Sequence, residues 1–209
     1  PMSFEKMSLD GALFDLAKVC NITKEMIAKM STEEVSKNVF EYAKKYDEEL
    51  FNLINRDYDY FKNIMSIERE VEKPRKDYEK YSDVKNAIIF FYNDYYDVMV
   101  NDIKFNENMN KEDIVDILTK YKKDLHLDVT EEEWFNKIKE LSVSLGFAAT
   151  PKEWKKNKEA FKGHVGDVSS VIRVMASTRT QSQNLYYVLK ILGKEEVERR
   201  IDKVLNLIK

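Results

Sequence analysis

The chain has 209 residues, of which 43% are hydrophobic and 35% are charged, with five glycines and three prolines. This composition excludes a disordered or fibrous protein, and no apolar run approaches the roughly 18–20 residues of a membrane span, so we expect no membrane contact. The single cysteine, Cys20, makes no disulfide within the chain, which agrees with a cytoplasmic protein.

Three helix starts are marked by a hydroxyl residue with a glutamate three positions later. Such a pair caps a helix reciprocally, because each side chain accepts a hydrogen bond from the other residue's backbone N–H. Pro151 follows the last of these hydroxyls, at a first-turn position where proline costs nothing. The three segments are Ser31-Thr32-Glu33-Glu34, Thr130-Glu131-Glu132-Glu133 and Thr150-Pro151-Lys152-Glu153.

Apolar residues recur at helical spacing behind these starts and near the end of the chain. Each such stripe predicts a helix with one face towards a core. Near the end of the chain the pattern breaks at Gly193, which predicts two helices joined by a tight turn. The stripes are Ile114, Ile117, Leu118, Tyr121 and Leu125; Trp134, Ile138, Leu141 and Leu145; Val188, Leu189 and Leu192; and Val197, Ile201, Val204 and Ile208.

The pattern predicts an all-α fold, an elongated helical body with three lobes. A proline at position 74 pushes the preceding residue out of the α region, which divides a helical segment of residues 1–72 from a lobe at 73–145. The loop before Pro151 opens a third lobe at 146–209. A tyrosine-rich helix is expected over residues 90–96, and its tyrosines at helical spacing are core rather than a stacking platform.

Charge divides the chain unevenly. Residues 151–209 contain 13 Lys and Arg against 7 Asp and Glu, a net charge of +6, which leaves −9 for residues 1–150. A basic end on an acidic body is typical of polyanion binding, although a solvated helix face would show the same excess. Lys155, Lys156, Lys158 and Lys162 are too many like charges for packing, and we expect them to contact phosphates.

The sequence lacks the motifs of a catalytic, phosphate-loop or metal site, so we predict no catalytic residue and no metal ligand. His126 reads as a loop residue, and His164 as either a phosphate contact or a turn. By contrast, residues 173–187 combine arginine, glutamine, asparagine and tyrosine, the groups that bond and stack with unpaired RNA bases.

Near the start of the chain, Phe4-Glu5-Lys6-Met7-Ser8 is followed by Gly11 to Leu16, and Ile67-Glu68-Arg69-Glu70 and Lys73 to Asp77 come later. Near the end come Gly163-His164, Ile172-Arg173-Val174, Leu192 to Glu196, and Arg200-Ile201. These segments resemble bacterial glutamyl-tRNA synthetases, a class I family, along the length of the chain. Lys6-Met7-Ser8 opens like that class's catalytic loop but continues with Leu9-Asp10, so we expect no ATP chemistry here. The resemblance implies a C-terminal fragment without the catalytic half, with a stem-contact segment and an anticodon-binding body.

The resemblance also implies which residues touch RNA. Arg173, Ser182 and Leu185 match positions that contact anticodon bases, Arg179 lies beside a basic position of the same loop, and Arg75 matches the arginine that separates glutamate from glutamine anticodons. Three alternatives stay open: Leu185 belongs to the core, Ser182 caps a helix that starts near Gln183, or Arg173 pairs with Asp167. The chain also lacks the family's loop glycine before Arg179, which predicts a shifted loop.

We therefore expect a monomeric part of a glutamate–tRNA ligase that binds the tRNA for glutamate. By resemblance, ATP and magnesium belong to the absent catalytic half, and this segment holds no cofactor. A helical protein-interaction module is the alternative, and a complete small enzyme is the third, least supported reading. Steep weakening of binding with salt would separate RNA binding from apolar helix docking.

Overall fold

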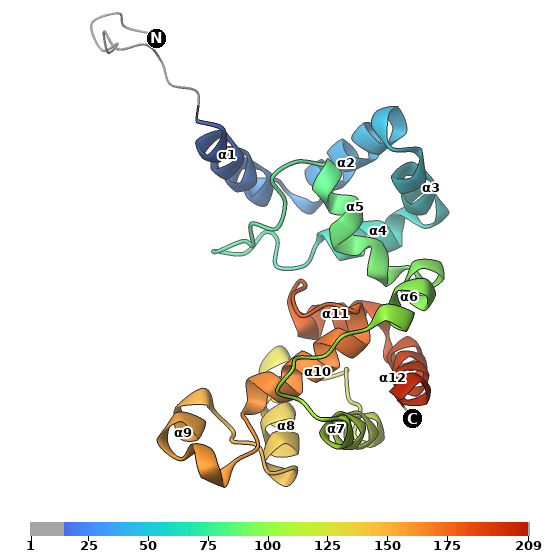
Figure 1. Cartoon of the computed structure of the whole chain (residues 1–209). Helices are drawn as coiled ribbons and strands as arrows, with labels where there is room; N and C mark the ends of the chain where they lie inside the picture. The colour runs from blue at the N-terminus through green and yellow to red at the C-terminus, as the bar shows by residue number, and fades with distance from the viewer. Residues whose placement is uncertain (1–14, 209) are drawn as a thin grey trace, which may run out of the picture.

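The computed structural model describes residues 15–208, and the expected all-α fold is confirmed for this range (Figure 1). An isolated parallel bridge between Ala148 and His164 is its only β pairing there. None of the described helices is long and apolar enough to cross a membrane. Lys6-Met7-Ser8 lies outside the described residues. The helices are α1 (Leu16–Lys29), α2 (Thr32–Tyr46), α3 (Glu48–Arg56), α4 (Tyr58–Met65), α5 (Ser82–Ile88), α6 (Asn93–Met99), α7 (Lys111–Lys123), α8 (Glu131–Ser144), α9 (Pro151–Lys156), α10 (Val165–Ser177), α11 (Leu185–Leu192) and α12 (Lys194–Ile208), with 3-10 turns η2 (Ile89–Phe91), η3 (Val100–Asp102) and η4 (Lys158–Ala160).

The helices form two groups along an elongated body (Figure 1). Helices α1 to α5 make the upper group and α7 to α12 the lower one, with α6 between them. Helix α11 contacts α4, so the two groups also meet away from the connecting chain. The predicted lobe boundaries at residues 72 and 145 stay a prediction.

The predicted helix starts are confirmed. Ser31 and Thr150 accept hydrogen bonds from the backbone N–H groups of Glu34 and Glu153, at 3.1 Å each. Thr130 forms the complete reciprocal box with Glu133. The break at Gly193 is also confirmed, because this residue has φ +79° between α11 and α12. Local side-chain chemistry thus sets the ends of these helices.

The single tyrosine-rich helix expected over residues 90–96 is wrong. The chain leaves helical geometry at Tyr92, with φ −96° and ψ 124°, between η2 and α6. Consecutive residues of a continuous helix point about 100° apart. Across the break, Phe90, Phe91 and Tyr92 are all buried, at 0%, 2% and 7% exposure. The expectation that the tyrosines belong to the core is confirmed for Tyr92 and Tyr96.

Helix α10 is the centre of the lower group and contacts α7, α8, α11 and α12. Its stretch from Val174 to Ser177 is completely buried. Apolar burial contributes roughly 1.5–3 kcal/mol for each large side chain, so Val174 and Met175 anchor this end of α10 in the core. Its position fixes the loop that follows it.

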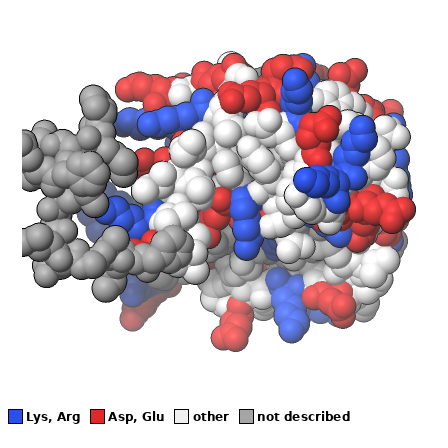
Figure 2. Space-filling view, turned by 90° about the horizontal axis from the view of Figure 1, so that it is seen from above, with Lys and Arg blue, Asp and Glu red and all other residues white. Residues whose placement is uncertain are grey.

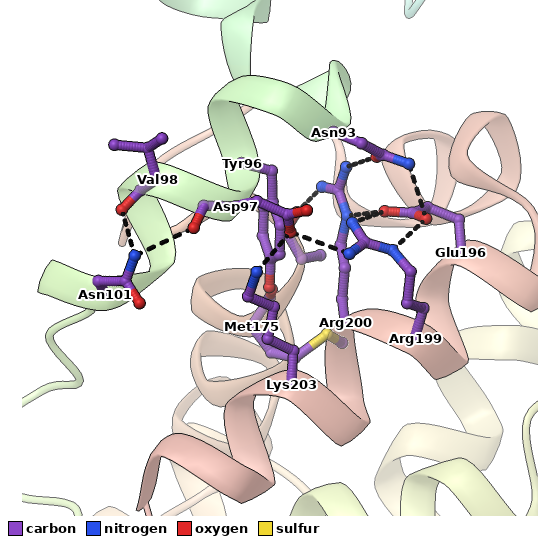
Figure 3. Close-up of polar contacts among 11 residues, drawn as sticks. Asn93, Tyr96, Asp97, Val98, Asn101, Met175, Glu196, Arg199, Arg200 and Lys203 are labelled. Atoms are coloured by element: carbon purple, nitrogen blue, oxygen red, sulfur yellow. Dashed lines mark hydrogen bonds and ion pairs between the residues drawn. The ribbon is translucent and has the colours of Figure 1, made fainter.

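A buried guanidinium joins α12 to α6 and to the end of α10 (Figure 3). Arg200 is 0% exposed, and its Nε donates to Oε1 of Glu196 at 2.6 Å. Its other nitrogens donate to the carbonyl of Ala176 at 2.5 Å and to Oδ1 of Asn93 at 3.2 Å. Its plane lies 3.8 Å from the centre of the Tyr96 ring. Each side of this charge is therefore in contact with a polar or aromatic partner.

The same network holds the pKa of Glu196 below its ordinary value of 4.5. Burial acts in the opposite direction, but hydrogen bonds from Arg199 and Arg200 outweigh it. A carboxyl group with a lowered folded-state pKa stabilises the fold above its unfolded pKa. That contribution is lost as the pH falls through the folded-state pKa.

Replacing Glu196 with glutamine should reduce the free energy of unfolding at pH 7 by roughly 3–5 kcal/mol, because Arg200 would stay buried without a carboxylate. Urea unfolding at pH 7 and at successively lower pH measures this difference, which should shrink below about pH 4.5. Glu195→Gln is the matched control, since Glu195 is an exposed carboxylate of the same helical turn. Equal losses in the two variants would show that the helix dipole, and not the Arg200 pair, accounts for the effect.

Candidate nucleic-acid interface

The loop between α10 and α11 carries most of the residues predicted to touch RNA. Helix α10 ends where Thr178 adopts left-handed geometry, with φ 60° and ψ 16°, and its N–H donates to the carbonyl of Val174 at 2.7 Å. A β-carbon in this region costs roughly 1–3 kcal/mol, which is why glycine is usual there. The chain therefore makes the left-handed turn without the glycine whose absence the sequence comparison noted.

Two hydrogen bonds to backbone carbonyls hold the end of α10 before this loop (Figure 3). The Tyr96 hydroxyl donates to the carbonyl of Met175 at 2.6 Å, next to the Arg200 bond to Ala176. The last carbonyls of a helix have no partner within it, so such bonds fix its final turn. The loop starts from a rigid base.

Arg173 reaches across the loop and binds its far side. Its Nη1 donates to Oγ of Ser182 at 2.7 Å and to the carbonyl of Gln183 at 2.8 Å. Asp167 instead accepts from the backbone N–H of His164 at 2.8 Å and from Asn108 at 3.0 Å. The alternative in which Arg173 pairs with Asp167 is wrong.

The charge of Arg173 is not neutralised by a carboxylate among residues 15–208, because its acceptors are carbonyl and hydroxyl oxygens. Burial, and then the nearby Arg75, lower the pKa of the guanidinium from its ordinary value of 12.5. A half-buried positive charge with neutral partners attracts an anion or an acceptor-rich ligand.

Arg75 contacts Ser182, although it lies 107 positions earlier in the chain. Its Nη2 donates to the carbonyl of Ser182 at 3.4 Å, the oxygen that Arg173 also contacts at 3.4 Å. Unlike Arg173, it has carboxylate partners, since both Nε and Nη2 donate to Asp77 and Glu68 lies 3.5 Å away. The structure thus brings together three predicted site residues, of which Arg173 is the one that keeps an unbalanced charge.

Arg179 is half-buried in the same loop, with its guanidinium 5.8 Å from the centre of the Phe90 ring. Burial lowers the pKa of Arg179. Phe90 is itself completely buried, so the ring forms a fixed surface under this side chain. The guanidinium thus has a cation–π contact and no carboxylate partner within the described part of the chain.

The structure also decides the open alternatives for Ser182 and Leu185. Ser182 is not the helix cap, because Oδ1 of Asn184 accepts from the N–H of Tyr186 at 3.1 Å and so caps α11. Leu185 is 4% exposed and begins α11 as part of the core. The sequence analysis missed Asn184 as a cap, although asparagine before an apolar run is a helix-start signal. Its Nδ2 also donates to Glu68 and Glu131, which ties the loop to two other segments.

The structure does not gather the four predicted phosphate-binding lysines at this loop. They lie in and after α9, before the start of α10, whereas the loop follows the end of α10. Helix α10 has 13 residues, so roughly 20 Å separates its ends. Lys155, Lys156 and Lys158 are exposed, and Lys158 also lies over the Trp154 ring at 5.0 Å. Lys162 is exposed but forms an ion pair with Asp113 at 2.5 Å, and its predicted phosphate contact stays a prediction.

Two other parts of the surface bear on the interface. His164 is the N-cap of α10 in extended geometry rather than part of a turn, and its Nδ1 accepts from the N–H of Gly166 at 2.9 Å. Figure 2 shows the face over the upper helices, where Lys and Arg side chains are interspersed with Asp and Glu. Such a mixed face does not present the field of one sign that attracts a phosphate backbone.

The sequence of the chain is similar to those of known proteins. Residues 38–205 match the family model described as an anticodon binding domain. The chain is 35% identical over 205 residues to a glutamate–tRNA ligase of Clostridium beijerinckii, covering 97% of this chain and 37% of that protein. It is also 37% identical to the glutamate–tRNA ligase of Acetivibrio thermocellus, with 98% of this chain and 37% of that protein covered. Its identity to the glutamate–tRNA ligase of Sorangium cellulosum is 33%, with 98% of this chain and 36% of that protein covered. It thus spans little more than a third of these relatives. The chain belongs to the anticodon-binding domain family.

Proposed function

We propose that the chain binds the anticodon loop of the tRNA for glutamate, as the non-catalytic part of a glutamate–tRNA ligase. Membership of the anticodon-binding family over residues 38–205 supports RNA binding, and the ligase names of its relatives support the choice of tRNA. The proposal includes a monomeric protein in the cytoplasm. It also assigns ATP and magnesium to the catalytic part of such a ligase and none of them to this segment.

The observation that carries the proposal is the half-buried Arg173, whose partners within residues 15–208 are neutral oxygens. Unpaired bases present oxygen and nitrogen acceptors that a guanidinium recognises by geometry as well as by charge. Arg75 and Arg179 add two further guanidinium groups to the same surface around the α10–α11 loop. By the resemblance, Arg75 is the residue that separates glutamate from glutamine anticodons.

The exposed lysines take a different part in the proposal. Lys155 and Lys156 form the last turn of α9 and have no ion pair among the described residues. At the opposite end of α10 from the loop, they are placed to contact the phosphate backbone beyond the bases that Arg173 reads. Contacts to phosphates position an RNA without reading its sequence.

A helical protein-interaction module remains the second candidate, because α1 presents large apolar side chains to solvent. Leu16, Ile22 and Met26 are 64%, 50% and 60% exposed. Exposed apolar patches mark protein contacts more often than RNA contacts. The two functions separate by salt dependence, since apolar docking does not weaken steeply with ionic strength.

Replacing Arg173 with alanine should weaken binding of the cognate anticodon stem-loop by roughly 5- to 150-fold, the range expected for one base contact. The loss should be smaller for a transcript with a substituted anticodon, because the missing contact is base-specific. Fluorescence anisotropy with matched transcripts measures both values. Arg56→Ala is the control, since Arg56 is an exposed arginine paired with Asp94. Unchanged binding in Arg173→Ala and Arg179→Ala alike would contradict the assigned loop.

Replacing Lys155 or Lys156 with alanine should lower the slope of log affinity against log salt by about 0.7–0.9 per phosphate contact. The ratio between cognate and substituted anticodons should stay constant, because the contact carries no base information. Affinities measured from about 50 to 200 mM salt give the slope. Lys80→Ala serves as the comparison, since Lys80 is 72% exposed and lies in the upper group. A changed anticodon ratio with an unchanged slope would overturn the phosphate role.

A further inference from the structure

A cavity of 380 Å³ lies between α4 and α11, beside the loop already described. Its walls combine two tyrosines, an amide, a hydroxyl and an amine with two isoleucine side chains. The cavity adjoins the α10–α11 loop of the protein. Glu68, in the segment after α4, accepts a hydrogen bond from Nδ2 of Asn184 in that loop at 2.9 Å. The polar and aromatic groups that line it are Tyr60, Asn63, Ser66, Tyr187 and Lys190.

The charge around Tyr187 favours this cavity over its neighbour. Tyr187 and Lys190 also line a second cavity on the α8 side, whose wall includes Asp128, Glu131 and Glu133. Three carboxylates repel a phosphate backbone, whereas the walls of the α4 cavity contain a lysine and no carboxylate. An RNA strand that reaches Tyr187 is therefore directed to the α4 side.

The rings of this cavity are held in place before a ligand arrives. The Tyr60 hydroxyl donates to the carbonyl of Phe91 at 3.2 Å, and its ring meets that of Tyr92 edge to face. Tyr187 packs edge to face on Tyr186, with the ring centres 5.1 Å apart. Burial, and then Glu131, raise the pKa of the Tyr187 hydroxyl, which stays protonated at neutral pH. Fixed aromatic rings lose little entropy when a base stacks on them.

The cavity also contains an amide side chain, that of Asn63, which can bond to the edge of a base. The side-chain amide of Asn63 is exposed and has no hydrogen bond to another group of residues 15–208. An amide offers both a donor and an acceptor, the combination that matches a base edge. Lys190 is exposed and lines both cavities, and its Nζ donates to the Tyr186 hydroxyl at 3.2 Å on the α8 side and keeps further N–H groups for a phosphate beside the pocket.

We propose that this cavity is a pocket for one unpaired RNA base, next to the bases met by the α10–α11 loop. This inference rests on the proposed function and adds a site to it. The base stacks on Tyr187, its edge meets Asn63, and Lys190 contacts the adjoining phosphate. The pocket thus adds a stacking contact to a loop that otherwise offers guanidinium and amide donors.

The test is a scan in which each loop nucleotide of an anticodon stem-loop is replaced in turn by an abasic one. At one position the abasic replacement should weaken binding of the unmodified protein by roughly 5- to 150-fold, the range for one stacked base. Tyr187→Ala should cause a loss of similar size on the intact RNA and no further loss at that one position. Tyr187→Phe keeps the ring and should bind as the unmodified protein does.

Tyr46→Ala is the matched control, since Tyr46 is a 65% exposed tyrosine on α2. Thermal unfolding of each variant checks the fold, and Asn63→Ala probes the same pocket from another wall if Tyr187→Ala is unstable. Equal losses for Tyr187→Ala with every abasic RNA would overturn the pocket, even with Arg173 still required for binding. An absence of anticodon-dependent binding by the unmodified protein would instead overturn the proposed function.

Discussion

The structure of the interface depends on one buried charge. Arg200 gains a carboxylate, an amide, a backbone carbonyl and an aromatic face, so its guanidinium is fully surrounded without being left unpaired. Breaking such a set would leave a charge in the core, which costs far more than a surface ion pair contributes. Because one of its partners is the carbonyl of Ala176, this constraint fixes the place where α10 ends and the loop begins. The loop that carries Arg179 begins two residues after this carbonyl.

Five of the arginines divide by their partners into two kinds, whereas the half-buried Arg69 donates to backbone carbonyls at the end of α1 and of α4. Arg200 and Arg199 donate to carboxylates and tie helices together, as Arg75 does to a lesser degree through Asp77. Arg173 instead donates to neutral oxygens, and Arg179 lies near an aromatic ring. Neither has a carboxylate partner among the described residues. The first kind stabilises the fold, and the second keeps a charge that no carboxylate of the described residues balances, which is the basis of the proposed RNA contact. Net charge, which is −3 for the whole chain, does not reveal this division.

Local signals in the sequence were sufficient for much of the fold. The caps at Ser31 and Thr130 and the turn at Gly193 depend on residues within a few positions, and the structure has them as expected. The broken helix at Tyr92 was missed because the burial of three successive aromatic rings there depends on the surrounding core, which no local pattern describes. Arg200 was also out of reach, since it lies in a highly charged stretch that reads as a solvated face. Its burial depends on Asn93 and Tyr96, about a hundred positions earlier.

We propose that the Arg173 guanidinium contacts RNA while that of Arg200 stays in the core. Side-chain ¹H–¹⁵N spectra of the arginines, recorded during titration with the anticodon stem-loop of the tRNA for glutamate, distinguish the two. The signals of Arg173 and Arg179 should move in proportion to the bound fraction, whereas that of Arg200 should stay unchanged. An unmoved Arg173 signal at saturated binding would show that this guanidinium does not contact RNA.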